Sequence, residues 1–151
     1  LQGLWVTFTL AAALAAITTT TRKELGVFSL VGFLVWLLGF TFAVTADAQK
    51  SRFRADPANK GRFIHTGLWA WSRHPNYFGE LGFWFGLFLF GLAAYPSGWY
   101  WEAIGFVLML LMFLTASIPM MEKRSLERRP NYQQVIDSTS MLIPLPPTRN
   151  R

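Results

Sequence analysis

The chain has 151 residues, enough for one domain, and 52% of them are hydrophobic while only 15% are charged. Soluble domains carry roughly 25% charged residues, so the composition predicts a membrane protein. The net charge is +6, but the basic residues lie between apolar runs rather than on one face, which excludes nucleic acid as the partner and favours the lipid bilayer. The absence of cysteine excludes disulfides and thiolate metal sites.

Apolar runs predict an all-α fold, an integral membrane helical bundle that forms a single domain over residues 1–151. Helices are expected because each unsatisfied backbone group is costly in lipid. The four predicted spans are residues 4–20, 27–46, 77–94 and 103–121. A polar connection, residues 47–76, joins the second and third spans, and an amphipathic tail, residues 122–151, follows the fourth. Because the first residue is Leu1, we expect further residues upstream.

The distribution of basic residues predicts the orientation of the spans. Six of the 14 lysines and arginines lie in the connection 47–76, six lie in the tail 122–151, and the turn after the third span has none. The connection and the tail share one side of a four-span protein. By the positive-inside rule, this side faces the cytoplasm, or the matrix or stroma of an organelle.

The connection begins with charged residues at helical spacing. Asp47, Lys50 and Arg54 lie on one face if the second helix continues past its apolar span. Asp47 lies near the membrane edge, where an ionisable group is a functional-site hypothesis. The alternative is a helix end whose charged side chains reach into the headgroups.

The third span begins in the sequence Arg73-His-Pro-Asn-Tyr-Phe-Gly-Glu80. Pro75 suits the first turn of a helix, so Arg73 and His74 would lie beside free N–H groups that favour an anion such as a pyrophosphate. Asn76 and Glu80 follow on one face. A carboxylate one turn into an apolar span needs a partner, and Glu80 would either contact a cofactor or form a structural bridge to an arginine.

Further residues near this octet each have more than one interpretation. Trp69 and Trp71 would stack on a purine or nicotinamide ring, or would be ordinary interfacial tryptophans. His74 is a proton donor, a phosphate ligand or a structural residue. It and His65 are the only histidines, without zinc-like spacing, so no metal site is predicted. Arg124 would reach a diphosphate or belong to a salt-bridged surface helix.

The octet resembles the R-H-x-N-Y-x-G-[DE] signature of sterol C14 and 7-dehydrocholesterol reductases. The wider chain, residues 27–147, resembles the C-terminal half of the steroid 5α-reductase family. This resemblance implies that the four predicted helices belong to a bundle of about seven, with an NADPH pocket open to the cytosol. The residues that the family resemblance implies for NADPH are Asp47, Arg54, Arg62, Asn76 and Glu80. By similarity to the sterol reductases, Arg73, Tyr77, Glu122 and Arg124 join them.

The resemblance implies an NADPH-dependent reductase of a double bond in a hydrophobic lipid substrate, by hydride transfer to the β-carbon of a polarised bond. The family polarises its substrate with residues of its first helices, and the spans predicted here resemble only the later ones. This chain would therefore carry the cofactor half of the site. Two alternatives remain. The Arg73-His-Pro75 sequence is also typical of isoprenylcysteine and phospholipid methyltransferases, whose cofactor is S-adenosylmethionine. In the second alternative, the chain would be a catalytically inactive subunit packed against other membrane subunits.

Overall fold

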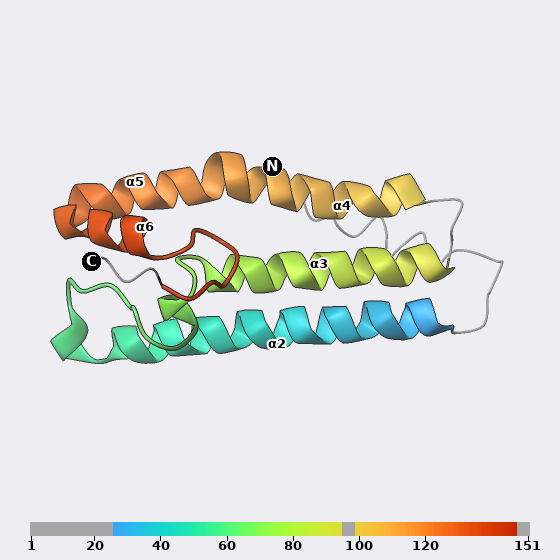
Figure 1. Ribbon diagram of the computed structural model, residues 1–151, viewed down its shortest axis with the longest axis horizontal. Helices are drawn as coiled ribbons and strands as arrows, with labels where there is room; N and C mark the ends of the chain where they lie inside the picture. The colour runs from blue at the N-terminus through green and yellow to red at the C-terminus, as the bar shows by residue number, and fades with distance from the viewer. Residues whose placement is uncertain (1–25, 95–98, 148–151) are drawn as a thin grey trace. The chain divides into compact units, whose positions relative to one another are not determined.

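The structure, a computed structural model, describes residues 26–94 and 99–147. These residues form helices and turns, with no strand among them (Figure 1). The helices are α2 (Val27–Ala55), α3 (Pro75–Ala94), α4 (Trp99–Met112), a π-helical segment (Phe113–Ser117), α5 (Ile118–Arg128) and α6 (Gln133–Ser138), with 3-10 turns at Pro57–Asn59, Gly67–Ala70 and Pro130–Tyr132. The predicted all-α class is confirmed. The predicted span 4–20 lies outside the described residues.

Two helical stretches are long and apolar enough to cross a membrane, residues Val27–Ala55 and Ala103–Arg128. In their most apolar windows only 17% and 22% of the residues are buried. A core helix of a soluble domain would be mostly buried, because its apolar side chains need protein around them. Phe28 and Leu38 of α2 are instead 76% and 70% exposed. The fold is therefore consistent with a helical membrane bundle.

The described chain divides into two compact units. The first contains residues 26–40, 80–94 and 99–112, and the second contains residues 41–79 and 113–147.

In the first unit, α2 and α3 approach each other closely at glycines. A Cβ added to Gly32 would lie 2.6 Å from the backbone nitrogen of Phe90, and one added to Gly86 would strike the backbone of Trp36. Small residues allow such backbone contact between membrane helices, where dispersion replaces the hydrophobic effect. The rings of Trp36 and Phe83 then pack beside this contact, 5.7 Å apart.

In the second unit, local sequence explains where α2 ends and α3 begins. After Ala55, the Asp56 carboxylate accepts a hydrogen bond from the Ala58 amide, which stabilises the following turn. The amide side chain of Asn59 donates to the Phe53 carbonyl at 2.9 Å and satisfies one of the carbonyl groups left free at the end of α2. Helix α3 begins at Pro75, as the sequence predicts.

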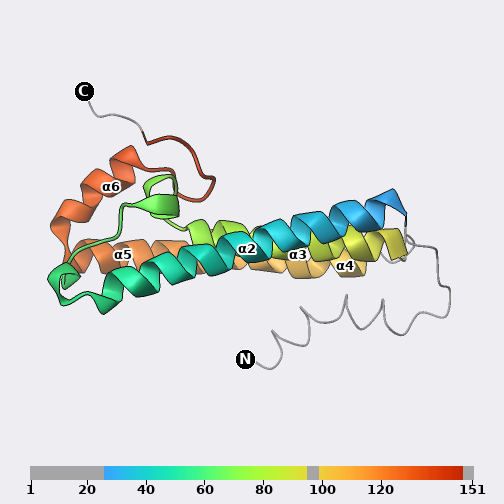
Figure 2. The ribbon, with the colours of Figure 1, turned by 90° about the horizontal axis from the view of Figure 1, so that it is seen from below.

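The C-terminal strap, residues 139–147, closes the second unit. The buried Ser72 hydroxyl donates to the Leu142 carbonyl at 2.9 Å, and the Ser140 carbonyl accepts from the Arg73 amide at 2.8 Å. Figure 2 shows α6 leaving the end of α5 and the strap returning beside the segment before α3. The strap thereby fixes residues 71–73, which lead into α3.

Candidate functional site

A pocket of about 270 Å³ lies in the second unit. Six of the side chains that line it are cationic, and none of the lining side chains is a carboxylate. The cationic residues are Lys50, Arg54, Lys60, Arg62, Arg73 and Arg129. So many like charges around one hollow repel each other, and an anion placed among them would relieve that repulsion.

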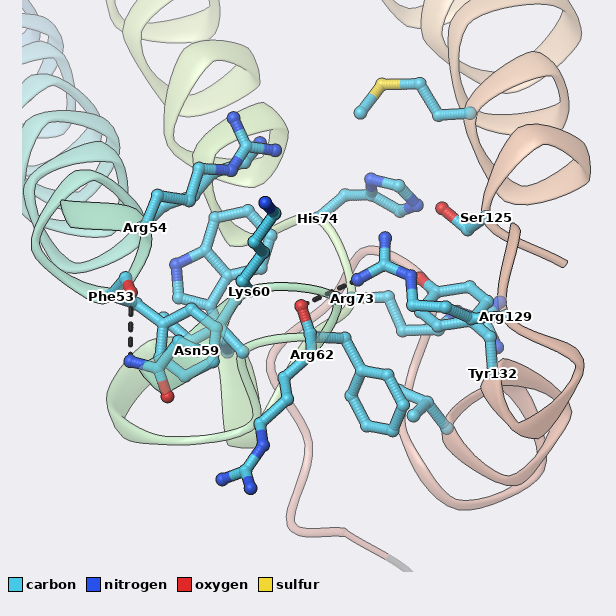
Figure 3. A pocket seen from close by; sticks show the side chains of 17 residues that line it. Phe53, Arg54, Asn59, Lys60, Arg62, Arg73, His74, Ser125, Arg129 and Tyr132 are labelled. Carbon is cyan, nitrogen blue, oxygen red and sulfur yellow. Dashed lines mark hydrogen bonds between the residues drawn. The ribbon is translucent and has the colours of Figure 1, made fainter. Parts of the chain in front are cut away.

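The basic side chains enter the pocket from different elements. Figure 3 shows Arg54 and Lys60 on one side, and His74 and Arg129 on the other. Within the described part of the chain, the side chains of Arg54 and Lys60 form no hydrogen bond or ion pair. Arg129 Nη1 donates to the Arg62 carbonyl at 2.7 Å, while the Arg62 guanidinium extends away from this group (Figure 3). Arg54 and Lys60 are therefore the cations most available to a ligand.

Aromatic side chains supply part of the apolar lining, beside the aliphatic residues Ile64, Met121 and Val135. The Lys50 ammonium lies 4.9 Å from the centre of the Trp69 ring, a cation–π distance, and the Trp69 indole donates to the Ala46 carbonyl at 2.9 Å. Tyr132 packs edge-on against Phe63, with ring centres 5.8 Å apart. Burial raises the pKa of Tyr132 above its usual value, with a smaller contribution from the nearby Glu122 carboxylate. The phenol is therefore neutral at pH 7.

Arg73 lines the pocket but is already held by the protein. Its Nε lies 2.8 Å from a carboxylate oxygen of Glu122, and the two side chains are only 8% and 17% exposed. The N–H direction does not fit a hydrogen bond, so this contact is chiefly ionic. Arg73 Nη1 also donates to the Ile136 carbonyl at 2.7 Å. The Arg73 charge is thus largely compensated, and the residue joins α3, α5 and α6.

His74 and Tyr77 extend this cluster along α3. His74 Nε2 lies 3.2 Å from the same Glu122 oxygen, and the His74 and Tyr77 rings are stacked with centres 5.6 Å apart. Tyr77 stacks in turn on Phe113 at 4.3 Å, and its hydroxyl donates to the Met121 sulfur at 3.0 Å. Phe113 begins the π-helical segment, so the π-helical turn places its ring against α3. Such turns are frequent at functional sites.

The structure brings together part of the predicted site. Four of the residues predicted to bind the cofactor line the pocket: Arg54, Arg62, Arg73 and His74. Two others, Tyr77 and Glu122, contact His74 directly without lining the pocket.

The remaining predicted residues do not line this pocket. Asp47 and Arg124 are exposed, on α2 and α5, and Trp71 is 48% exposed. Asn76 is half-buried in the first turn of α3. Glu80 is half-buried one turn later, has an interaction of its own, and belongs to the first unit by its contacts.

Several lining residues were not among the predicted site residues. Lys50 shares a helical face with Arg54, so the sequence held a signal for it. Lys60 lies two residues before Arg62 in the same loop. Arg129 and Tyr132 had no such signal, because only the turn between α5 and α6 brings them to the pocket.

The match to a family model decides the classification. Residues 1–139 match the family described as "Protein of unknown function (DUF1295)". The chain belongs to this family. It is also 35% identical over 94 residues to an uncharacterized protein of Schizosaccharomyces pombe. That alignment covers 62% of this chain and 27% of the yeast protein, so this DUF1295 chain matches about a quarter of its relative's length. No solved structure matches the chain significantly.

Proposed function

We propose that this DUF1295 chain is the cofactor-binding part of a membrane-embedded, NADPH-dependent reductase that acts on a double bond of a hydrophobic lipid. The observation that carries the proposal is the pocket itself, with six cationic lining side chains, no lining carboxylate and aromatic rings beside them. Such a lining suits a polyanion that also has a flat ring system.

The donor set fits the phosphate-bearing part of NADPH. Arg54 and Lys60 are unpaired within the described part of the chain and would bind the pyrophosphate or the 2′-phosphate, with charge-assisted hydrogen bonds. Trp69 and Tyr132 would contact the ribose or the adenine. The volume of about 270 Å³ is slightly below the ~300–1,000 Å³ usual for small-molecule sites, so this pocket would hold part of the dinucleotide.

Arg73, His74 and Glu122 would maintain the shape of the site rather than bind NADPH themselves. Glu122 holds both Arg73 and His74, which keeps the start of α3 in place beside the pocket. Bound NADPH supplies a hydride to the substrate. The nicotinamide end is assigned by resemblance alone to Asn76 and Glu80, which do not line the pocket.

S-adenosylmethionine is the competing cofactor, because the sequence Arg73-His-Pro75 is also typical of methyltransferases that use it. It carries a sulfonium cation and no phosphate, so a pocket with six cationic side chains fits it poorly. If the chain were an inactive subunit that only packs against others, neither cofactor would bind.

We infer further that the pocket opens on the cytoplasmic, matrix or stromal side, because the basic segments lie there by the positive-inside rule.

A binding titration tests the proposal. The full chain, purified in detergent, is titrated with NADPH, NADH and S-adenosylmethionine, and NADPH is expected to bind selectively. Arg54→Gln should weaken NADPH binding about tenfold or more, because a charged hydrogen bond contributes ~1.5–3 kcal/mol. Arg52→Gln is the matched control, since Arg52 is exposed on the same helix and does not line the pocket.

Three results would refute the proposal. They are tighter binding of S-adenosylmethionine than of NADPH, no binding of either cofactor, and equal NADPH affinity in the Arg54→Gln and Arg52→Gln variants.

A further inference from the structure

The C-terminal strap carries apolar side chains that the pocket does not use. Met141, Ile143 and Leu145 are 37%, 59% and 52% exposed, whereas Leu142 and Pro144 between them are half-buried. The strap therefore exposes apolar side chains at alternate residues, and we call these three residues the apolar face of the strap. Leaving such a face in water is unfavourable by roughly 25 cal/mol for each Å².

Trp71 lies beside this face. The strap's Leu145 amide donates to the Trp71 carbonyl at 3.0 Å, and the neighbouring Ser72 hydroxyl donates to the Leu142 carbonyl at 2.9 Å. Trp71 is 48% exposed and does not line the pocket. Its large ring thus adds exposed apolar surface at a residue whose backbone is bonded to the strap.

The position of this surface along α2 indicates what covers it. Trp69, two residues before Trp71, donates its indole N–H to the Ala46 carbonyl. Ala46 is the last residue of the uncharged run that starts at Val27, and Asp47 begins the charged part of α2. Trp71 and the strap therefore lie near the level where a membrane-crossing α2 leaves the hydrocarbon, and tryptophan concentrates at that interface.

We propose that Trp71, Met141, Ile143 and Leu145 form an interfacial membrane anchor. Their side chains enter the boundary between lipid headgroups and acyl chains, to a depth of ~5–10 Å. The occupant is lipid, because the hydrogen bond from Trp69 to Ala46 ties the segment that carries Trp71 to the last residue of the apolar run of α2. The anchor is independent of the bound cofactor, and it holds residues 71–73 and the adjoining pocket against the membrane surface.

Site-specific labelling tests the anchor cleanly because the chain has no cysteine. A bimane fluorophore is attached at Ile143→Cys, and the full chain is reconstituted in phosphatidylcholine vesicles. Quenching is measured with lipids brominated near the headgroup end of their acyl chains, and with iodide in the water. Asp137→Cys, exposed on α6, is the matched control, and Leu145→Cys provides a second position on the same face should Ile143→Cys fail to fold.

The anchor predicts strong quenching by brominated lipid and weak quenching by iodide at position 143, with the reverse at position 137. Equal iodide quenching at both positions would overturn it, because the strap would then lie in water. Protection of position 143 from both quenchers would also overturn it, since a second copy or another protein would then cover the face. NADPH affinity, measured on the same samples, tests the cofactor proposal separately.

Discussion

The ion pair between Arg73 and Glu122 gives the sharpest prediction about stability. The change Glu122→Gln keeps the shape of the side chain and its hydrogen-bonding capacity toward His74, but it removes the carboxylate charge. Arg73 is then left charged, with its side chain only 8% exposed. Removing one partner of a buried pair costs ~3–5 kcal/mol, and because Glu122 is 17% exposed we expect the lower end, about 3 kcal/mol.

The measurement is thermal unfolding of the full chain in detergent. For a chain of this length, 1 kcal/mol shifts Tm by ~2–4 °C, so Tm should fall by about 6–12 °C. Glu127→Gln is the control, because Glu127 is exposed on the same helix, and it should change stability by no more than about 0.5 kcal/mol. The double variant with Arg73→Gln should lose less stability than the two single variants together.

An equal, small effect of Glu122→Gln and Glu127→Gln would refute the reasoning. So would additive losses in the double variant, since two residues that interact directly must show coupling.

Glycine positions provide two further predictions. Gly86→Leu should abolish folding or lower Tm sharply, because its Cβ would meet the backbone of Trp36, whereas Gly26→Ala, which has open space around it, should leave Tm unchanged. Gly67→Ala should destabilise more than Gly61→Ala in the same melts. Both glycines have positive φ, +60° and +80°, which strains alanine by ~1–3 kcal/mol. Only the Cβ at position 67 would also displace the Gln49 side chain, whose amide oxygen accepts a hydrogen bond from the Leu68 amide. Equal losses at positions 67 and 61 would contradict this.

Much of the fold followed from the sequence alone. The uncharged run 27–46 lies within α2, the predicted span 77–94 lies within α3, and the predicted span 103–121 lies within the helical stretch from α4 to α5. These elements are local: a long apolar run has no satisfactory backbone conformation in lipid except a helix. The start of α3 at Pro75 was equally local, since proline fits the first helical turn.

The boundaries of the polar segments were less predictable. Helix α2 continues nine residues beyond the predicted span, to Ala55, and the connection 47–76 contains two 3-10 turns as well. The π-helical turn at Phe113–Ser117 had no signal in the sequence. It depends on packing, because it presents Phe113 to Tyr77 of another helix.

The candidate site also depends partly on the local sequence and partly on the tertiary structure. The sequence by itself determined that basic residues gather in the connection 47–76 and the tail 122–151, because charged side chains avoid the hydrocarbon. Only the tertiary structure decided which of them meet around one hollow. It left Arg54 and Lys60 without partners in the described part of the chain but paired Arg73 with Glu122. Such pairing joins residues far apart in sequence, and local spacing carries no information about it.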